Sequence, residues 1–596
     1  MASKKTLINY TSRDFDSIKT DLLLYAKKNY SETYRDFEEA SFGAMTLDMV
    51  AYVGDMLSYY VDYQANEMFL DSAVEQNNVI RHAKSFGYNY EGLASSVGEV
   101  DFFILAPANS TGLGPDSSYL PILSAGASIT SDGGASFTLV DDVRFDYSQN
   151  EVVPARIGDS GVPTHYAIKA SGQVVSGEIK TVKIQSGDHE RFKKLKVSSQ
   201  NIAEIISVVD SSGQEFYEVS NLSQDVIYRD VANRSSDSDN VRSVLRPFSA
   251  SRRFTIERLQ SGTFLQFGTG TEEELKSSSV SKVSDVALKI YGKNYTTSTT
   301  FDPSKLTSTS KMGVVPSNST LTIKYRINNS SKSNAAVGSL KRISSKSVLF
   351  KDSTMLSSGK MSDVSTSLEV SNSERIVGST TIPDNTEIRN RARGAYAAQD
   401  RAVTVQDLET FTYMMPAKYG SAKRCKAARS RGDRRRSTDL YLLSEDTNGK
   451  LVAPTDTLKQ NIKMWISQKK MMNDTIYLKD GKILNYAVDF SISADPSKNK
   501  HEVLNSAISA LKKGLEEPLY MGEPLYLTDI YGILNKVVGV VDTRNVNISI
   551  KSGLGYSATA VDIRKLLSVD GMTVEVPENV ALEMKYPSSD INGSVT

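Results

Sequence analysis

The chain has 596 residues, which at roughly 150 residues per domain suggests about four domains. It carries 70 Lys and Arg against 70 Asp and Glu. Proteins that bind nucleic acid usually carry a basic excess, so this balance disfavours them, while zero net charge favours self-association. The single cysteine, Cys425, excludes an internal disulfide and a cysteine-based zinc site, and 4 scattered histidines disfavour a histidine site. We expect no metal and no other cofactor.

The chain shows no targeting or membrane signal. Its first 17 residues lack the apolar core of a signal peptide, and no run approaches 18 apolar residues. We therefore expect a protein that is made or assembled in a cytoplasm-like compartment and does not enter a membrane.

The first part of the chain, to about Gly92, has helical periodicity. Ser12 is placed to cap a helix that carries Phe15 and Ile18 on its apolar face. A later helix is predicted to start with Ser72 and Glu75 as a capping box and to end before Gly87.

The helix predicted over residues 44–70 is the strongest local signal. Apolar side chains cover most of its circumference, more than the arc of about 100° that packs on one neighbour. Asp48, Asp55 and Asp62 mark one narrow polar stripe. Either the flanking helices of the same chain cover this helix, or it joins a bundle of several chains. Met and Tyr are enriched in interfaces, and the candidate partner-facing residues are Met45, Met49, Tyr52, Met56, Tyr59, Tyr60 and Tyr63.

The rest of the chain changes character twice. Short β-branched segments bounded by turn residues predict a β-rich body with long loops over residues 96–345. Residues 346–437 are mixed and then helical, and residues 438–596 alternate helices with strands, which is typical of a ferredoxin-like α+β domain. With the helical region at residues 1–95, we predict a multidomain α+β protein.

Short catalytic-looking strings lack the residues that catalysis needs. The string at 158–161 has the Gly-Asp-Ser-Gly order of a protease loop, but His82 is the only histidine before it and sits on a predicted helix. No Gly-x-Gly string opens a helix in the manner of a phosphate-binding loop. We therefore expect no enzyme and no small-molecule substrate.

A basic cluster at residues 423–436 allows two interpretations. It is either a solvated hairpin loop or an electrostatic contact for an acidic partner. Aromatic residues do not interleave with these cations, which disfavours nucleic acid. The contact candidates are Arg424, Arg434, Arg435 and Arg436.

Five motifs follow one another over about 370 residues. The first combines residues 43–49, 67–71 and 81–88, including Gly87 and Tyr88. The others are residues 125–129 with Phe137, residues 265–270 with Gly268 and Gly270, Tyr325 and Arg326 with Asn334, and Arg401 to Thr404 with Asp407.

In this order, the motifs resemble the baseplate J-like family, which includes baseplate wedge proteins of contractile-tailed phages of the T-even type. The resemblance implies a structural subunit of the virion tail baseplate, assembled in the bacterial host cytoplasm. It implies pairing with a second copy, a helical bundle with other wedge proteins, contacts with sheath-initiating and hub-proximal proteins, and a role in triggering sheath contraction. A receptor- or carbohydrate-binding tail component and a tail-associated hydrolase are the alternatives.

Overall fold

The structure is a computed structural model that describes residues 14–30, 32, 41–159, 161–199, 201–232, 243–273, 312–328, 333–430, 437–515, 519–553 and 555–595. Its contacts divide the chain into two compact units. The first comprises Met1–Tyr90 and Pro383–Asp400, and the second comprises Glu91–Ile382 and Arg401–Thr596. The finer division into four domains stays a prediction.

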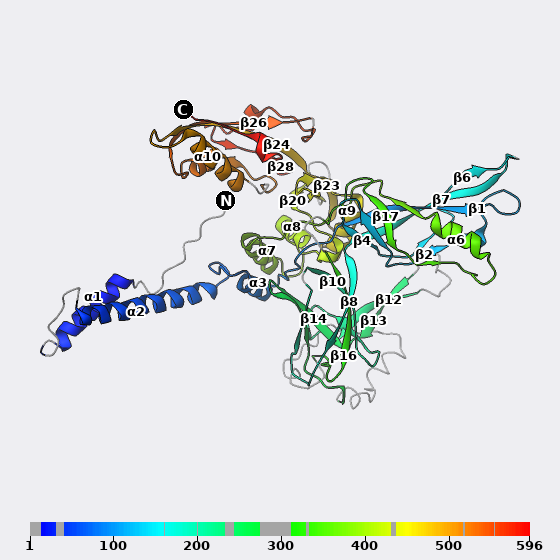
Figure 1. Ribbon diagram of the computed structural model, residues 1–596, viewed down its shortest axis with the longest axis horizontal. Coiled ribbons are helices and arrows are strands. Elements are labelled where there is room, and N and C mark those ends of the chain that lie inside the picture. The colour runs from blue at the N-terminus through cyan, green and yellow to red at the C-terminus, as the bar shows by residue number, and fades with distance from the viewer. Residues whose placement is uncertain are drawn as a thin grey trace. The chain divides into compact units, whose positions relative to one another are not determined.

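The first unit is helical (Figure 1). Asp14 caps its first helix by accepting a hydrogen bond from the Ser17 N–H, and Asp384 caps the last one in the same way. The predicted capping box at Ser72 is wrong, because the Ser72 hydroxyl donates to the Asn66 carbonyl and Glu75 is the N-cap. The helices are α1 Phe15–Asn29, α2 Phe42–Glu67, α3 Gln76–Ser85 and α7 Asn385–Ala398.

The second unit contains two larger β-sheets, each of seven strands among the described residues. The first sheet encloses a core with Phe102, Ile129 and Phe137 at its centre. Its strands, in spatial order, are β17 Leu340–Ser345, β3 Ser128–Ser131, β4 Ser136–Leu139, β7 Pro163–Ser176, β1 Val97–Pro107 and β19 Glu369–Ser371, with β6 Glu151–Ile157 also paired to β7.

The second sheet surrounds its own apolar core, in which Phe216, Phe254 and Phe267 meet edge-on or tilted. Its order is β8 Glu178–Gln185, β16 Thr320–Ile327, β10 Ile202–Val209, β11 Glu215–Glu218, β14 Arg253–Leu259, β15 Gly262–Phe267 and β9 Lys194–Val197. Smaller elements are the ribbon β12 Val226–Ala232 with β13 Ser243–Ser249, the sheet β18 Val348–Leu349, β2 Ile122–Leu123 and β5 Val143–Arg144, the helix α6 Ser358–Thr366 and the 3-10 turn η1 Ser117–Tyr119.

The remainder of this unit mixes helices and strands. One sheet contains β20 Arg424–Arg429, β21 Ser437–Glu445, β22 Leu451–Val452 and β23 Thr475–Asp480, with α8 Val405–Tyr413, α9 Asp456–Ser467 and the turn η3 Ala417–Tyr419 nearby in sequence. The last sheet contains β26 Val540–Lys551, β24 Lys482–Ala494, β28 Val580–Glu583 and β29 Ile591–Val595. Around it are α10 Lys500–Gly514, α11 Leu527–Leu534, α12 Pro587–Asp590, η4 Ile563–Lys565 and the pair β25 Leu525–Tyr526 and β27 Thr573–Val574.

The predicted α+β class, with an N-terminal helical region and a β-rich body, is confirmed. The ferredoxin-like prediction for the C-terminal region is not confirmed. A ferredoxin-like fold follows the order βαββαβ. Here both α10 and α11 lie between β24 and β26, and β28 and β29 run parallel to β24 along its other edge.

Candidate interaction surface

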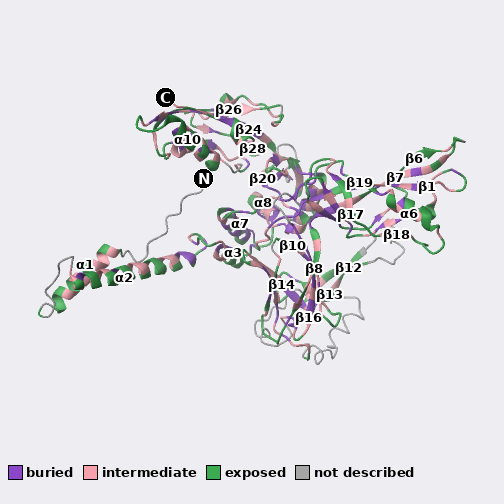
Figure 2. Ribbon diagram, viewed as in Figure 1, coloured by how far each residue is buried: buried purple, intermediate pink, exposed green. Residues whose placement is uncertain are grey.

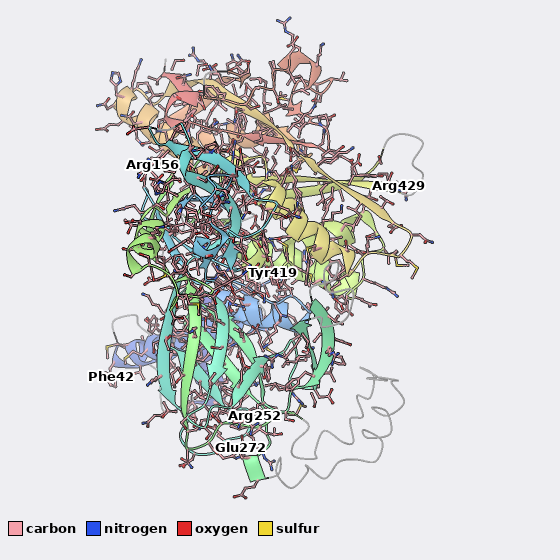
Figure 3. The ribbon with its side chains drawn as sticks, turned by 90° about the vertical axis from the view of Figure 1, so that its right-hand side faces the viewer. Phe42, Arg156, Arg252, Glu272, Tyr419 and Arg429 are labelled. Atoms are coloured by element: carbon pink, nitrogen blue, oxygen red, sulfur yellow. The ribbon has the colours of Figure 1, made fainter. Side chains whose placement is uncertain are left out.

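The long helix α2 keeps most of its apolar side chains uncovered in this chain. Figure 2 shows α2 largely in the colours of exposed and intermediate residues. Met49 is 63% exposed and Tyr52 is 59% exposed. Phe42, at the start of the helix, also projects outward (Figure 3). Buried residues of α2 are small or lie at its C-terminal end: Ala44, Ala51, Asn66 and Glu67.

Large apolar residues of α2 form two stripes with heptad spacing, and all of them are exposed except Met56 and Tyr63, which are half-buried. We name the first the Met/Tyr seam and the second the Val/Leu seam. Each Val/Leu residue directly follows a Met/Tyr residue in the sequence, so the second seam lies about 100° further around the helix. Alternating steps of three and four residues are the spacing of a coiled-coil contact. The Met/Tyr seam is Met45, Met49, Tyr52, Met56, Tyr59 and Tyr63, and the Val/Leu seam is Val50, Val53, Leu57 and Tyr60.

Helix α1 covers a different side of α2. Lys19 Nζ lies 2.8 Å from Asp48 Oδ1. A Cβ at Gly54 would lie 3.3 Å from Ile18, so the absence of a side chain there lets α1 approach closely. The side of α2 that carries Asp48, a member of the polar stripe, is therefore the side on which α1 packs. The exposed residues of both seams remain open.

The segment between α2 and α3 is held by the carboxylate of Glu67. This side chain accepts hydrogen bonds from the N–H groups of Val74 and Glu75, at 2.7 and 3.2 Å, and from Asn78 at 2.8 Å. Burial opposes ionisation of Glu67, but these hydrogen bonds outweigh it and hold its pKa below the ordinary value. The bend after α2 is thus fixed by an ionised, buried group.

Helix α7, from a distant part of the chain, contacts the same bend through hydrogen bonds and an ion pair. Arg389 is buried and donates to the carbonyls of Leu70, at 2.8 Å, and Ala73. On the same helix, Asn385 donates to the carbonyl of Val74 and Arg393 pairs with Asp71. These contacts set the direction in which α2 leaves its base, and sequence reasoning missed them because the partners are more than 300 positions apart.

Gly87 and Tyr88 have a structural role at the end of α3. Gly87 has φ +89°, and its N–H and that of Tyr88 donate to the carbonyls of Lys84 and Ala83 at 3.0 Å each. This is a Schellman termination, which needs a left-handed residue at the glycine position. The predicted end of the helix is confirmed, and Tyr88 is buried behind it.

Thr404 and Asp407 form a capping box at the start of α8, as predicted. The Asp407 N–H donates to Thr404 Oγ1 at 3.1 Å, and the Thr404 N–H donates to Asp407 Oδ2 at 2.8 Å. Arg401 is exposed beside this cap. Thr404 and Asp407 therefore organise the chain locally, and a structural role of Arg401 stays a prediction.

Gly268 lies where two backbone segments meet. A Cβ at this position would lie 2.0 Å from the carbonyl oxygen of Met312, so a side chain does not fit. Nearby, the N–H groups of Thr269 and Gly270 both donate to the carbonyl of Gly313. Residues 268–270 therefore have a structural role, because they let two backbone segments pack directly against each other.

Arg424 does not contribute to an exposed basic surface. It is 2% exposed, and its guanidinium carbon lies 4.3 Å from the centre of the Tyr520 ring. The expectation of a surface contact is wrong for this residue, because its stacking partner is almost 100 positions away in the sequence. Arg434, Arg435 and Arg436 lie outside the described residues, whereas Arg429, at the end of β20, is exposed (Figure 3).

Among the described residues, no helix is both long and apolar enough to span a membrane. Within the same ranges, no cluster of three or more His, Cys, Asp or Glu side chains is arranged to hold a metal ion.

Comparison with protein families gives one match, and it falls on this surface. The family described as bacteriophage baseplate protein, N-terminal domain, matches residues 14–85, which span α1, α2 and α3. This match supports a baseplate component as the class of protein. Comparison with curated proteins gives no match.

Solved structures from two contractile systems also align with the chain. One is a chain of the anti-feeding prophage baseplate, with 8% identity, a TM-score of 0.24, and coverage of 95% of this chain and 90% of that one. The other belongs to the TssK-TssF-TssG baseplate subcomplex of a type VI secretion system, with 9% identity, a TM-score of 0.27, and coverage of 72% and 96%. Likenesses at these TM-scores carry no conclusion about fold or function.

Proposed function

We propose that the protein is a structural wedge subunit of a contractile-tail baseplate and that α2 joins it to other subunits in a helical bundle. The uncovered apolar surface of α2 is the observation that carries this proposal. Burying one large apolar side chain stabilises a protein by roughly 1.5–3 kcal/mol. The eight exposed seam residues therefore offer a large driving force to a partner. The family match over the same helices supports the baseplate as the place of assembly.

The two seams indicate the number of helices that α2 needs. A helix packed in a coiled coil uses one seam for each partner. Because α1 occupies a third side, the Met/Tyr seam and the Val/Leu seam each require one more helix. We infer that these come from a second copy of this chain and from a different wedge protein, as the resemblance to baseplate J-like proteins implies.

The bundle is tested by placing charge in the Met/Tyr seam. Met49→Asp with Met56→Asp buries two carboxylates if a partner helix packs there, so we expect co-purification with the second wedge protein to be lost. Met464→Asp is the matched control, because Met464 is 70% exposed on α9, outside the family-matched region. A folded double variant that assembles like the control would refute the proposal.

Self-association through the C-terminal region is a second element of the proposal. Strand β26 pairs with β24 on one side and forms the edge of its sheet, and Val538 and Val541 are exposed at its start. Long edge strands with exposed apolar residues are prone to pair with another chain. We expect the full chain to be dimeric by light scattering, and Val538→Asp with Val541→Asp to make it monomeric. A wild-type monomer at high concentration would exclude this element.

In an assembled baseplate, such contacts would join wedges into a ring around the central hub. Contacts with sheath-initiating and hub-proximal proteins, and transmission of the change that triggers contraction, follow from the same resemblance. These two expectations depend on the wedge role and are refuted if the wedge role is refuted.

A further inference from the structure

The two-stranded ribbon of β12 and β13 exposes several large apolar side chains beyond the contacts at its base. Seven residue pairs form it, from Val226 opposite Ser249 to Ala232 opposite Ser243. Among the described residues, neither strand pairs with a third. An isolated two-stranded hairpin is marginally stable in water, so a ribbon of this length gains from a surface to pack on.

Both faces of the ribbon expose apolar side chains. Tyr228 and Leu245 are 63% and 62% exposed on one face. Val231 and Val244 lie directly opposite each other on the other face and are exposed as well. Residues two apart in a strand share a face, so Arg229, Arg246 and Phe248 lie on the same face as the two valines. We name this face the arginine face.

The base of the arginine face is fixed to the body of the protein. Arg229 donates to the Tyr217 hydroxyl at 3.1 Å and lies over the rings of Tyr217 and Phe248. Tyr217 and Phe248 meet edge-on at 5.5 Å. The outer part, with Val231, Val244 and Arg246, is therefore presented from a rigid base.

The charges of this face are unbalanced. Arg229 and Arg246 are directly opposite each other, an arrangement that destabilises a strand pair. Glu215 lies 4.0 Å from Arg229, whereas no carboxylate among the described residues lies within ion-pair distance of Arg246. Arg252, which follows the ribbon, shows the contrast, because its guanidinium makes two hydrogen bonds to Glu272 at 2.9 and 2.7 Å (Figure 3).

We propose that the arginine face docks another protein, through a surface on which carboxylates lie among apolar side chains. Carboxylates between the two arginines would relieve their repulsion, and apolar neighbours would cover Val231 and Val244. The charge pattern selects an acidic partner, and the exposed valines select a protein surface over a free anion. This docking surface is distinct from α2 and belongs to the other unit.

The test uses full-length protein in assembled particles, with a photo-crosslinking residue in place of Val244. We expect an adduct with a different protein, at a segment that has Asp or Glu within two residues of the crosslink. Arg246→Glu in the same chain should lower the adduct yield at least about tenfold, because it turns attraction into repulsion. Lys324→Glu, an exposed cation on β16, is the matched control and should change the yield less than about twofold.

Three outcomes overturn the proposal: no adduct from Val244, an adduct at a segment without carboxylates or on a second copy, or an unchanged yield with Arg246→Glu. A parallel crosslinker at Met49 distinguishes this from failure of the wedge assignment. If Met49 forms adducts and Val244 does not, the docking proposal alone fails. If neither Met49 nor Val244 forms an adduct, the bundle proposal fails together with the docking proposal.

Discussion

Helices α2 and α10 have similar apolar periodicity and opposite surroundings. In α10, Val503, Ala507 and Leu511 are 3%, 0% and 0% exposed because they pack against the sheet of β24. In α2, the corresponding stripes stay open although the helix is longer. The same pattern therefore has two uses: α10 completes a core within its own chain, and α2 presents an apolar surface that the described residues of its own unit leave open.

The largest expected effect is on the α10 side of this comparison. Leu511→Ala removes a fully buried side chain and should lower the free energy of unfolding by about 3 kcal/mol. Met49→Ala, at an exposed site on α2, should change it by less than about 0.5 kcal/mol. Denaturant unfolding of the isolated chain measures both. Equal losses would show that Met49 is packed within the single chain.

The next effect concerns the base of α2. Arg389→Met removes the donors to two buried carbonyls and should cost about 2 kcal/mol of local stability. Hydrogen exchange at the amides of Val74 and Glu75 should become faster. Asn390→Met is the matched control, because Asn390 is exposed on the same helix. If exchange is unchanged, the grip of α7 does not fix the bend.

The third prediction concerns an ion pair of the β-rich body and its dependence on pH. Arg144, and then Lys351, hold the pKa of Asp146 at about 2. Because this pKa is lowered by folding, its contribution is complete above the ordinary pKa near 4 and disappears as the pH falls through about 2. Asp146→Asn should therefore lower stability by at most about 2 kcal/mol at pH 6 and by almost nothing near pH 1, below both pKa values. A full difference that persists near pH 1 would contradict this cause.

The smallest expected effect is at the contact between α1 and α2. Lys19→Ala removes a partly exposed ion pair and should cost less than about 0.5 kcal/mol. A calorimetric scan of the isolated chain, compared with Lys324→Ala, measures it. A large loss would mean that α1 and α2 form a tightly held pair without partners.

Elements whose signal is local were predictable from the sequence. The strand over residues 320–327, the capping box of Thr404 and Asp407, and the glycine that ends α3 depend on neighbours within a few positions. The sequence predicts two strands, over residues 540–542 and 547–550, where the structure has the single strand β26. A register shift near Thr543 interrupts the alternation while the strand continues.

Elements that depend on distant contacts were not predictable. Nothing near Arg389 in the sequence indicates that it binds the carbonyls after α2, and nothing near Arg424 indicates that it stacks on Tyr520. The candidate surface on α2 could be predicted because its signal is local. The sequence of this one helix is apolar on more sides than a single neighbour would cover. The partners that we propose for this surface are other chains, whose sequences cannot be inferred from this one.

The central claim, that the Met/Tyr seam is covered in the assembly, is tested most directly by methionine oxidation. In the isolated chain, Met49 should be oxidised about as fast as Met355 and Met472, which are 90% and 94% exposed. In assembled particles, oxidation of Met45 and Met49 should slow at least about tenfold, because a partner helix excludes the oxidant. If Met45 and Met49 are oxidised equally fast in the particle and in the isolated chain, the seam is not an interface.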